Sequence, residues 1–219
     1  MDPYNLLINV LVYAIPVIFA ITLHEAAHGY VARMFGDNTA WMLGRVTLNP
    51  AKHIDPVGTV VVPLVTVALT GYMFGWAKPV PVNFAHLRAP QRRHSIYVAA
   101  AGPASNVVQA LLWALVLRVL AEFAANNGLV GSFWMSIAEK GVFINVIFAV
   151  LNLVPILPLD GGRIVANMLP PRAAYSYSRL ESYGMPILIL LMVTGAFSYV
   201  LGPPVMLATN GIFSLFGLQ

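Results

Sequence analysis

The sequence predicts an all-α polytopic membrane protein, a bundle of about five or six transmembrane segments with a re-entrant or β-like loop. Two observations lead to this fold class. The 219-residue chain is 59% hydrophobic and only 9% charged, whereas soluble domains carry about a quarter charged residues. Uncharged stretches of about twenty residues, the length that crosses a bilayer as a helix, also recur along the chain. Because so many crossings use most of the chain, we expect a single integral-membrane domain over residues 1–219.

The first predicted helix covers roughly residues 4–35. It should end at Gly36, because glycine often follows the last residue of a helix. The N-terminus lacks the basic stretch and the small-residue cleavage site of a signal peptide. We therefore expect this helix to be retained in the membrane.

The next apolar runs differ in how regular they are. Glycines and prolines interrupt the run 56–77, which favours a re-entrant piece shielded by protein or by a water-filled cavity. The run 95–117 is the clearest spanning helix. A fourth run covers about 134–159 and is broken near its end by Pro155 and Pro158.

The C-terminal part is apolar and carries no charge after Glu181. The Gly-Pro-Pro sequence at 202–204 is expected to split it into a helix and a shorter apolar segment. Within the single domain we therefore distinguish a core of about residues 4–170 from C-terminal apolar segments of about 182–219.

The charged residues sit at the edges of the apolar runs. The net charge is +4, but no block of Lys and Arg with interleaved aromatic residues occurs, so we expect no nucleic-acid partner. Basic residues follow the first helix, precede the third apolar run and follow the fourth, which places those ends on the cytoplasmic side. The chain has no cysteine, so any metal would be held by His, Asp or Glu.

The cluster His24-Glu25-Ala26-Ala27-His28 lies near the inner end of the first predicted helix. On a helix, His24 and His28 share one face and can bind one zinc ion, with Glu25 beside the bound water as general base. Chance matches to three fixed positions are common. Ionisable groups inside a membrane are expensive, however, and this favours a functional site over the alternative, a polar network that closes the helix bundle.

A catalytic zinc usually has three protein ligands and a water molecule. The best third candidate is Asp160, at the inner end of the fourth apolar run and on the same side as His24 and His28. The alternative is that Asp160 caps a short helix beginning at Gly161.

Other polar residues are more ambiguous. Asn152 could hold a substrate carbonyl or a developing oxyanion, or it could satisfy backbone groups freed by the following prolines. Asn106 could be a hydrogen bond between helices or a site residue. His53, His86 and His94 lie in basic connecting loops, where exposed histidines are expected.

At this point the chain resembles the site-2 proteases, a family of intramembrane zinc metallopeptidases. The resemblance rests on the cluster at 24–28 and on the stretch 152–161, Asn-Leu-Val-Pro-Ile-Leu-Pro-Leu-Asp-Gly. That stretch is similar to the family's Asn-x-x-Pro-x-Pro-x-x-Asp-Gly motif, with the second proline displaced by one residue. The segments 53–59 and 78–83 also look like family segments. The resemblance covers about residues 20–165 and leaves the C-terminal tail outside.

The resemblance implies one Zn²⁺ per chain, ligated by His24, His28 and Asp160. It implies that Glu25 is the general base and that Asn152 helps to bind substrate or the oxyanion. The expected reaction is cleavage of a peptide bond within or near a transmembrane segment of a single-span membrane protein, in the lipid bilayer. We expect a minimal form without extra soluble domains, in the cell membrane of a prokaryote, with its active site toward the cytoplasmic side.

Two other functions compete with this one. A zinc or proton transporter would distribute its ligands along a pathway and show inverted repeats, and neither is visible in the sequence. A catalytically silent member would bind clients without cutting them, but Glu25 is present. For the protease, we expect the 75–83 stretch to offer a strand edge that holds the unwound substrate.

Overall fold

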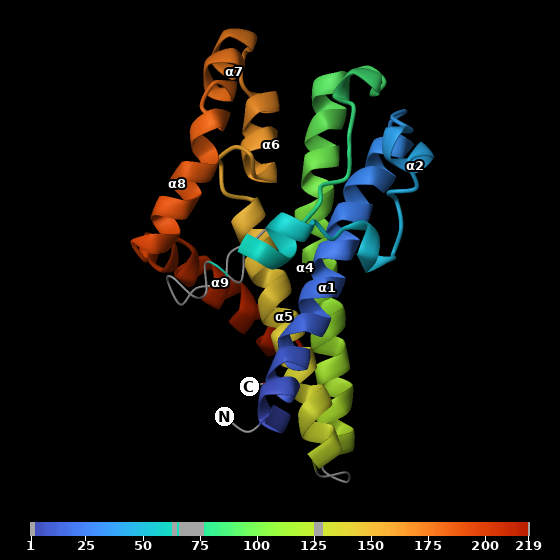
Figure 1. Ribbon diagram of the computed structural model, residues 1–219, viewed down its shortest axis with the longest axis vertical. Coiled ribbons are helices and arrows are strands. Elements are labelled where there is room, and N and C mark those ends of the chain that lie inside the picture. The colour runs from blue at the N-terminus through green and yellow to red at the C-terminus, as the bar shows by residue number, and fades with distance from the viewer. Residues whose placement is uncertain (1–2, 63–64, 66–76, 125–128, 219) are drawn as a thin grey trace.

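The computed structural model describes residues 3–62, 65, 77–124 and 129–218. Over these residues the fold is all-helical and contains no strand, which confirms the predicted class. Three long helices, α1 (Pro3–Met34), α4 (Gln91–Ala124) and α5 (Leu129–Asn152), run along the long axis of the molecule (Figure 1). The shorter helices are α2 (Thr39–Met42), α6 (Asp160–Met168), α7 (Pro171–Ser178), α8 (Glu181–Val193) and α9 (Ala196–Leu215), with single turns η1 (Pro50–Lys52), η2 (Pro56–Val61) and η3 (Phe84–His86).

The described residues contain fewer candidate membrane spans than the five or six predicted for the chain. Three helical stretches are long and apolar enough to cross a bilayer: Val10–Met34, Gln91–Ala124 and Ser132–Asn152. The pair α8 and α9 adds a fourth only if it is counted as one span bent by 85°. Most of the second apolar run, predicted to be re-entrant, lies outside the described part of the chain, at residues 63–64 and 66–76.

Helix α1 ends as its sequence predicts. Gly36 has a φ of 109°, a left-handed conformation that glycine adopts without strain. The N–H of Asp37 then donates to the Ala32 carbonyl and the N–H of Gly36 to the Arg33 carbonyl. This pair of bonds satisfies carbonyls that the end of a helix leaves free.

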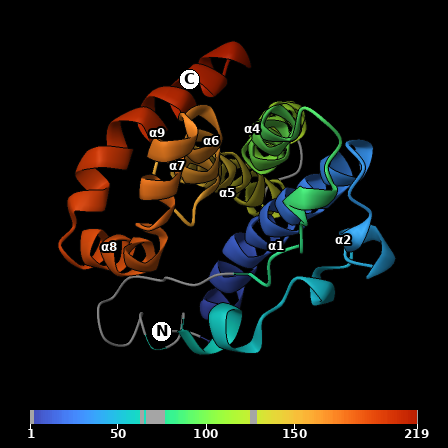
Figure 2. The same cartoon turned by 90° about the horizontal axis from the view of Figure 1, so that it is seen from above.

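The predicted break at residues 202–204 is wrong. Helix α9 continues through Pro203 and Pro204, and the chain turns at Gly195, whose φ is 72°. A sharp turn needs a residue with positive φ, and Gly195 provides it, while Gly202 keeps a helical conformation. In both views α8 and α9 lie on the side of the bundle away from α2 (Figures 1 and 2).

The loop before α4 is held by side chains rather than by strand pairing. Residues 78–83, called here the proline segment, are irregular, and no strand is found there. Its N–H groups donate to the His53 carbonyl (from Lys78), to Glu25 (from Val80) and to Asp37 (from Asn83). The β-like expectation is thus not met in residues 77–83, because these contacts and two prolines use up most of the N–H groups that a ladder needs.

Two histidines are placed differently from the prediction. His53, expected in an exposed loop, is buried, and its Nε2 hydrogen-bonds to the Thr47 carbonyl at 3.0 Å. The His53 carbonyl accepts from the Lys78 N–H, so the loop packs against the proline segment. His94 lies in the first turn of α4 rather than in a loop and is half-buried, with its ring stacked on Phe35. His86 does stay exposed.

Helix α4 is the central element and packs against α1, α5 and α6. Its contact with α5 and α9 is built from small and branched residues: Ala110, Ala114, Val142, Val146 and Val205. Small residues let membrane helices approach closely. Close packing of α1, α4 and α5 brings polar side chains of the three helices together.

Candidate metal centre

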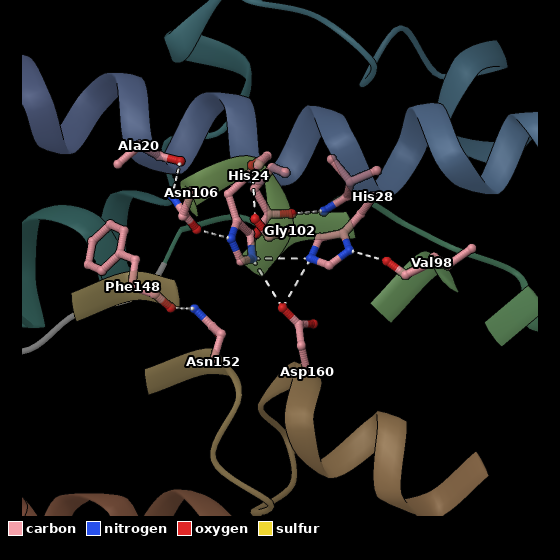
Figure 3. A network of polar contacts seen from close by, with 12 residues as sticks. Ala20, His24, His28, Val98, Gly102, Asn106, Phe148, Asn152 and Asp160 are labelled. Carbon is pink, nitrogen blue, oxygen red and sulfur yellow. Dashed lines mark hydrogen bonds and ion pairs between the residues drawn. The ribbon is translucent and has the colours of Figure 1, made fainter. Parts of the chain in front are cut away.

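Three predicted residues meet at one point. His24 and His28 project from α1, and Asp160 comes from the first turn of α6 (Figure 3). The two Nε2 atoms are 3.1 Å apart, and Asp160 Oδ2 lies 3.2 Å from that of His24 and 3.3 Å from that of His28. The three side chains are only 10–13% exposed. Over the described residues, this is the one group of His, Asp and Glu whose atoms could together hold a metal ion.

Helix α4 holds both imidazoles by their other nitrogen. His28 Nδ1 lies 2.7 Å from the Val98 carbonyl oxygen, and His24 Nδ1 lies 2.6 Å from Asn106 Oδ1. A carbonyl oxygen only accepts, so the proton of a neutral His28 sits on Nδ1 and its Nε2 presents a lone pair. The outer contacts therefore turn the coordinating nitrogens toward Asp160.

The donor set fits a zinc ion. Two Nε2 lone pairs and a carboxylate oxygen at 3.1–3.3 Å repel one another unless a cation lies between them. Tetrahedral zinc with bonds of about 2.0–2.1 Å places its ligand atoms about 3.3–3.4 Å apart. Asp160 Oδ2 is buried and meets no hydrogen-bond donor among the described residues. Nitrogen and oxygen ligands of this kind are those that zinc takes in catalytic sites.

Gly102 lets α4 approach both imidazoles closely. A methyl group at this position would lie 2.5 Å from both Cε1 and Nε2 of His24 and would also overlap His28 Nε2. Those distances are far inside van der Waals contact. A glycine is therefore required where α4 passes the two imidazole rings.

Asp160 reaches the histidines because α6 folds tightly against the loop before it. Methyl groups at Gly161 and Gly162 would lie 2.5 Å from the Val154 carbonyl oxygen and from the Leu157 nitrogen, respectively. The alternative role of Asp160 as a helix cap is not seen: Leu159 precedes α6, and no side chain caps it.

The Asp160 carboxyl is ionised at neutral pH. Burial raises its pKa, but the imidazoles of His24 and His28, when protonated, lower it by more, to about 2. A metal cation in place of those protons acts in the same direction. Asp160 therefore presents a negative charge to whatever lies between the two histidines.

Glu25 lies on the same helix as the histidines, with its carboxylate held by the proline segment. Its Oε2 accepts a hydrogen bond of 2.7 Å from the Val80 N–H. Gly29, one turn further along, makes room for this segment, because a methyl group there would lie 3.0 Å from the Val80 side chain. The second carboxylate oxygen retains its own acceptor capacity.

Asn152 is not drawn into the cluster. Its Nδ2 donates to the Phe148 carbonyl at 3.0 Å, one turn back in α5 (Figure 3). The amide has a second N–H and a carbonyl oxygen beyond this contact.

The structure adds two asparagines to the surroundings of the cluster. Asn106, left undecided there, contacts His24 directly, and Asn145 of α5 contacts Asn106. A usable signal existed for Asn145: an amide in the middle of an apolar membrane helix is expensive unless it has a partner. Gly102 lies one turn before Asn106 on α4 and on the same face.

Comparisons with known proteins agree with this chemistry. Residues 120–195 match the family described as Peptidase family M50. The chain is 39% identical over 210 residues to YwhC of Bacillus subtilis (strain 168), which covers 92% of this chain and 89% of the relative. It is 31% identical over 179 residues to Rip2 of Mycolicibacterium smegmatis, covering 82% and 65%. Both relatives bear the name "Putative zinc metalloprotease". No solved structure matches the chain.

Proposed function

The chain belongs to peptidase family M50, the site-2 proteases, and on that premise we propose that it hydrolyses a peptide bond within or near a transmembrane segment of a single-span membrane protein. That it is a zinc metalloprotease embedded in a membrane follows from the family and from the apolar helices. Cleavage within or near a transmembrane segment is supported by one observation above all. The cluster of His24, His28 and Asp160 lies beside the C-terminal half of Val10–Met34, a helix long and apolar enough to cross a bilayer.

In this proposal His24, His28 and Asp160 hold one zinc ion. Bound there, zinc supplies a Lewis acid and a water of lowered pKa. The chain's own contribution is a fixed and mostly buried set of ligands. Val98 and Asn106 orient the imidazoles, and the tight turn at Gly161 orients the carboxylate.

Glu25 is the proposed proton carrier. It would take a proton from the attacking water and deliver it to the leaving amine. The Val80 N–H fixes Oε2, so the proton would be received at Oε1. A hydrogen bond from a backbone amide also lowers the rotational freedom of the carboxylate and therefore favours one orientation of the base.

In the proline segment, fewer N–H groups are available to pair with a substrate than the sequence predicts. Asn152 has an amide hydrogen that could donate to a substrate carbonyl. Among the six residues 78–83, Val82 is the only one whose N–H is neither missing nor used in the contacts described above. Strand pairing with an unwound substrate would therefore use mainly carbonyl oxygens of the proline segment.

The proposed partners are a single-span substrate and the lipid bilayer, with no nucleic acid. The basic residues at the inner ends of α1 and before α4 support an orientation with the metal centre toward the cytoplasm. The proposed location is the cell membrane of a prokaryote, which the bacterial sources of the similar proteins support.

The test is cleavage of single-span substrates by the detergent-purified chain. Glu25→Gln keeps the size of the side chain and removes its basicity, so cleavage should fall at least about 100-fold while zinc content is retained. Glu122→Gln is the matched control, because Glu122 is exposed and, in the part of the chain that the structure describes, forms its ion pair with Arg118 of the same helix. It should cleave like the parent.

Three results would contradict the proposal. One is Glu25→Gln cleaving as fast as the parent. Another is an unchanged product band after a chelator has removed zinc. The third is equal cleavage of soluble peptides and of the membrane-spanning substrate, which would leave a zinc protease but remove the intramembrane specificity.

A further inference from the structure

A chain of buried amides connects three helices to the metal cluster. His24 Nδ1 meets Asn106 Oδ1 at 2.6 Å, and Asn106 Nδ2 donates to the Ala20 carbonyl at 3.2 Å and to Asn145 Oδ1 at 2.9 Å. Asn145 Nδ2 donates to the Gly141 carbonyl at 2.9 Å. Both asparagines have no exposed surface. This series of hydrogen bonds runs from α5 through α4 to α1, and Figure 3 shows the part that joins Asn106 to His24 and Ala20.

The backbone carbonyls of Gly141 and Ala20 determine which group donates and which accepts in each of these hydrogen bonds. The Gly141 carbonyl can only accept, so the NH₂ group of Asn145 faces it and Oδ1 faces Asn106. Asn106 must then direct its NH₂ group at Asn145, and the Ala20 carbonyl takes the other hydrogen. Only Oδ1 of Asn106 is left for His24.

The consequence reaches the metal ligand. Because Asn106 offers an acceptor, a neutral His24 must carry its proton on Nδ1. Its Nε2 then presents a lone pair, and the ring cannot turn over without losing the bond of 2.6 Å. His28 is fixed in the same way by a main-chain carbonyl, which no substitution at position 98 removes. The orientation of His24, in contrast, depends on one side chain.

We propose that Asn106, anchored by Asn145 and by the Ala20 carbonyl, is the positioning residue that fixes the tautomer and orientation of His24 for metal binding. This rests on the proposed function, since it assigns the metal to His24, His28 and Asp160. Asn106 does not itself touch the metal or the substrate. Replacing a residue that hydrogen-bonds to a metal ligand in this way typically weakens metal binding about 10- to 100-fold.

A neighbouring amide shows how a merely structural one differs. Gln109 lies one turn further along α4, is also buried, and approaches the same Ala20 carbonyl at 3.5 Å. Its Oε1 meets no hydrogen-bond donor among the described residues, so it forms no hydrogen bond there with His24 or His28. Gln109→Leu therefore removes a buried amide from the same helix without affecting His24, which makes it the matched control for Asn106→Leu.

The first measurement is zinc affinity, by competition with a chelator, on the detergent-purified full chain. Asn106→Leu should bind zinc about 10- to 100-fold more weakly. Asn145→Leu leaves Asn106 Oδ1 in place but removes its anchor, so its loss should be smaller. Gln109→Leu should match the parent. The visible spectrum of bound Co²⁺ should change in the same order.

The second measurement needs no variant of Asn106, so it decides the matter even if Asn106→Leu fails to fold. In ¹⁵N-histidine-labelled metal-free protein above the histidine pKa, the signal that His24→Gln removes should show Nδ1 protonated and Nε2 bare. Protonation at Nε2 would overturn the proposal.

The remaining outcomes are equally decisive. Equal zinc affinity for folded Asn106→Leu and for Gln109→Leu would reduce Asn106 to a packing residue. A parent chain that binds no zinc and cleaves nothing would instead refute the proposed function itself. A parent that binds zinc and cleaves, with Asn106→Leu unaffected, would refute only the role of Asn106.

Discussion

The glycines around the metal centre and those of α9 have opposite surroundings. A methyl group at Gly29, Gly102 or Gly161 would collide with neighbouring side chains or backbone, whereas one at Gly202 or Gly211 of α9 would meet nothing within 4 Å. The same residue type thus serves two purposes. Near the site it permits close approach of chain segments that carry function. In α9 no neighbour among the described residues requires it.

The largest effect is expected at Gly102. Gly102→Ala places a methyl group against both imidazole rings and would displace them, so zinc binding and cleavage should both fall at least about 100-fold. Metal content of the purified chain checks this directly, together with thermal unfolding of the metal-free form. A variant that keeps one zinc per chain would show that the positions of these rings do not control metal binding.

A moderate effect is expected at Asp37, which ties the end of α1 to the loop before α4. This buried carboxylate accepts hydrogen bonds from Thr39 and from the Asn83 N–H, and it lies 3.5 Å from His86 Nδ1. Asp37→Asn should cost about 1–3 kcal/mol at neutral pH. Thermal unfolding of the metal-free chain in detergent measures the loss.

The same residue predicts a pH dependence. Burial raises the pKa of Asp37, but hydrogen bonds from Thr39 and Asn83 lower it by more, to below its ordinary value. Its stabilisation is therefore complete above about pH 4, the pKa of an unfolded Asp, and is lost as the pH falls through the lower folded value. Asp37→Asn should lack this part of the acid-induced loss. An unchanged acid limb would show that Asp37 contributes no linkage.

The smallest effect is expected in α9, and it sharpens the comparison of the two kinds of glycine. Gly202→Ala should leave stability unchanged or raise it by up to about 1 kcal/mol, because alanine is the better helix former. Gly141→Ala in α5 is the matched contrast: its methyl group would lie 2.5 Å from Trp113, at a cost of about 1–3 kcal/mol. A destabilised Gly202→Ala would show that the open face of α9 is covered by another molecule.

The metal cluster could be predicted because it depends on local rules. His24 and His28 share a helix face by their spacing alone, and the end of α1 at Gly36 follows from glycine's tolerance of positive φ. Predicting Asp160 as the third ligand also required an inference about the side of the membrane on which the fourth apolar run ends. Basic residues supplied that information.

The rest depended on contacts that sequence spacing does not encode. Asn106 and Asn145 lie 39 residues apart, and their amides are oriented by carbonyls at either end of the chain of hydrogen bonds. The turn at Gly195 was missed because two prolines are a stronger local signal for a break, yet α9 accommodates them. His53 is buried because the proline segment folds over it, a tertiary contact that its basic neighbours do not reveal.

The peptide group between Pro79 and Val80 is held from both sides: its N–H by Glu25 and its carbonyl oxygen by Arg45 Nη2, at 3.2 Å. A peptide plane held at both its oxygen and its hydrogen cannot rotate without losing one of the two hydrogen bonds. The direction in which Glu25 points therefore depends on an arginine from the loop between α2 and η1, which acts on the peptide rather than on the carboxylate itself.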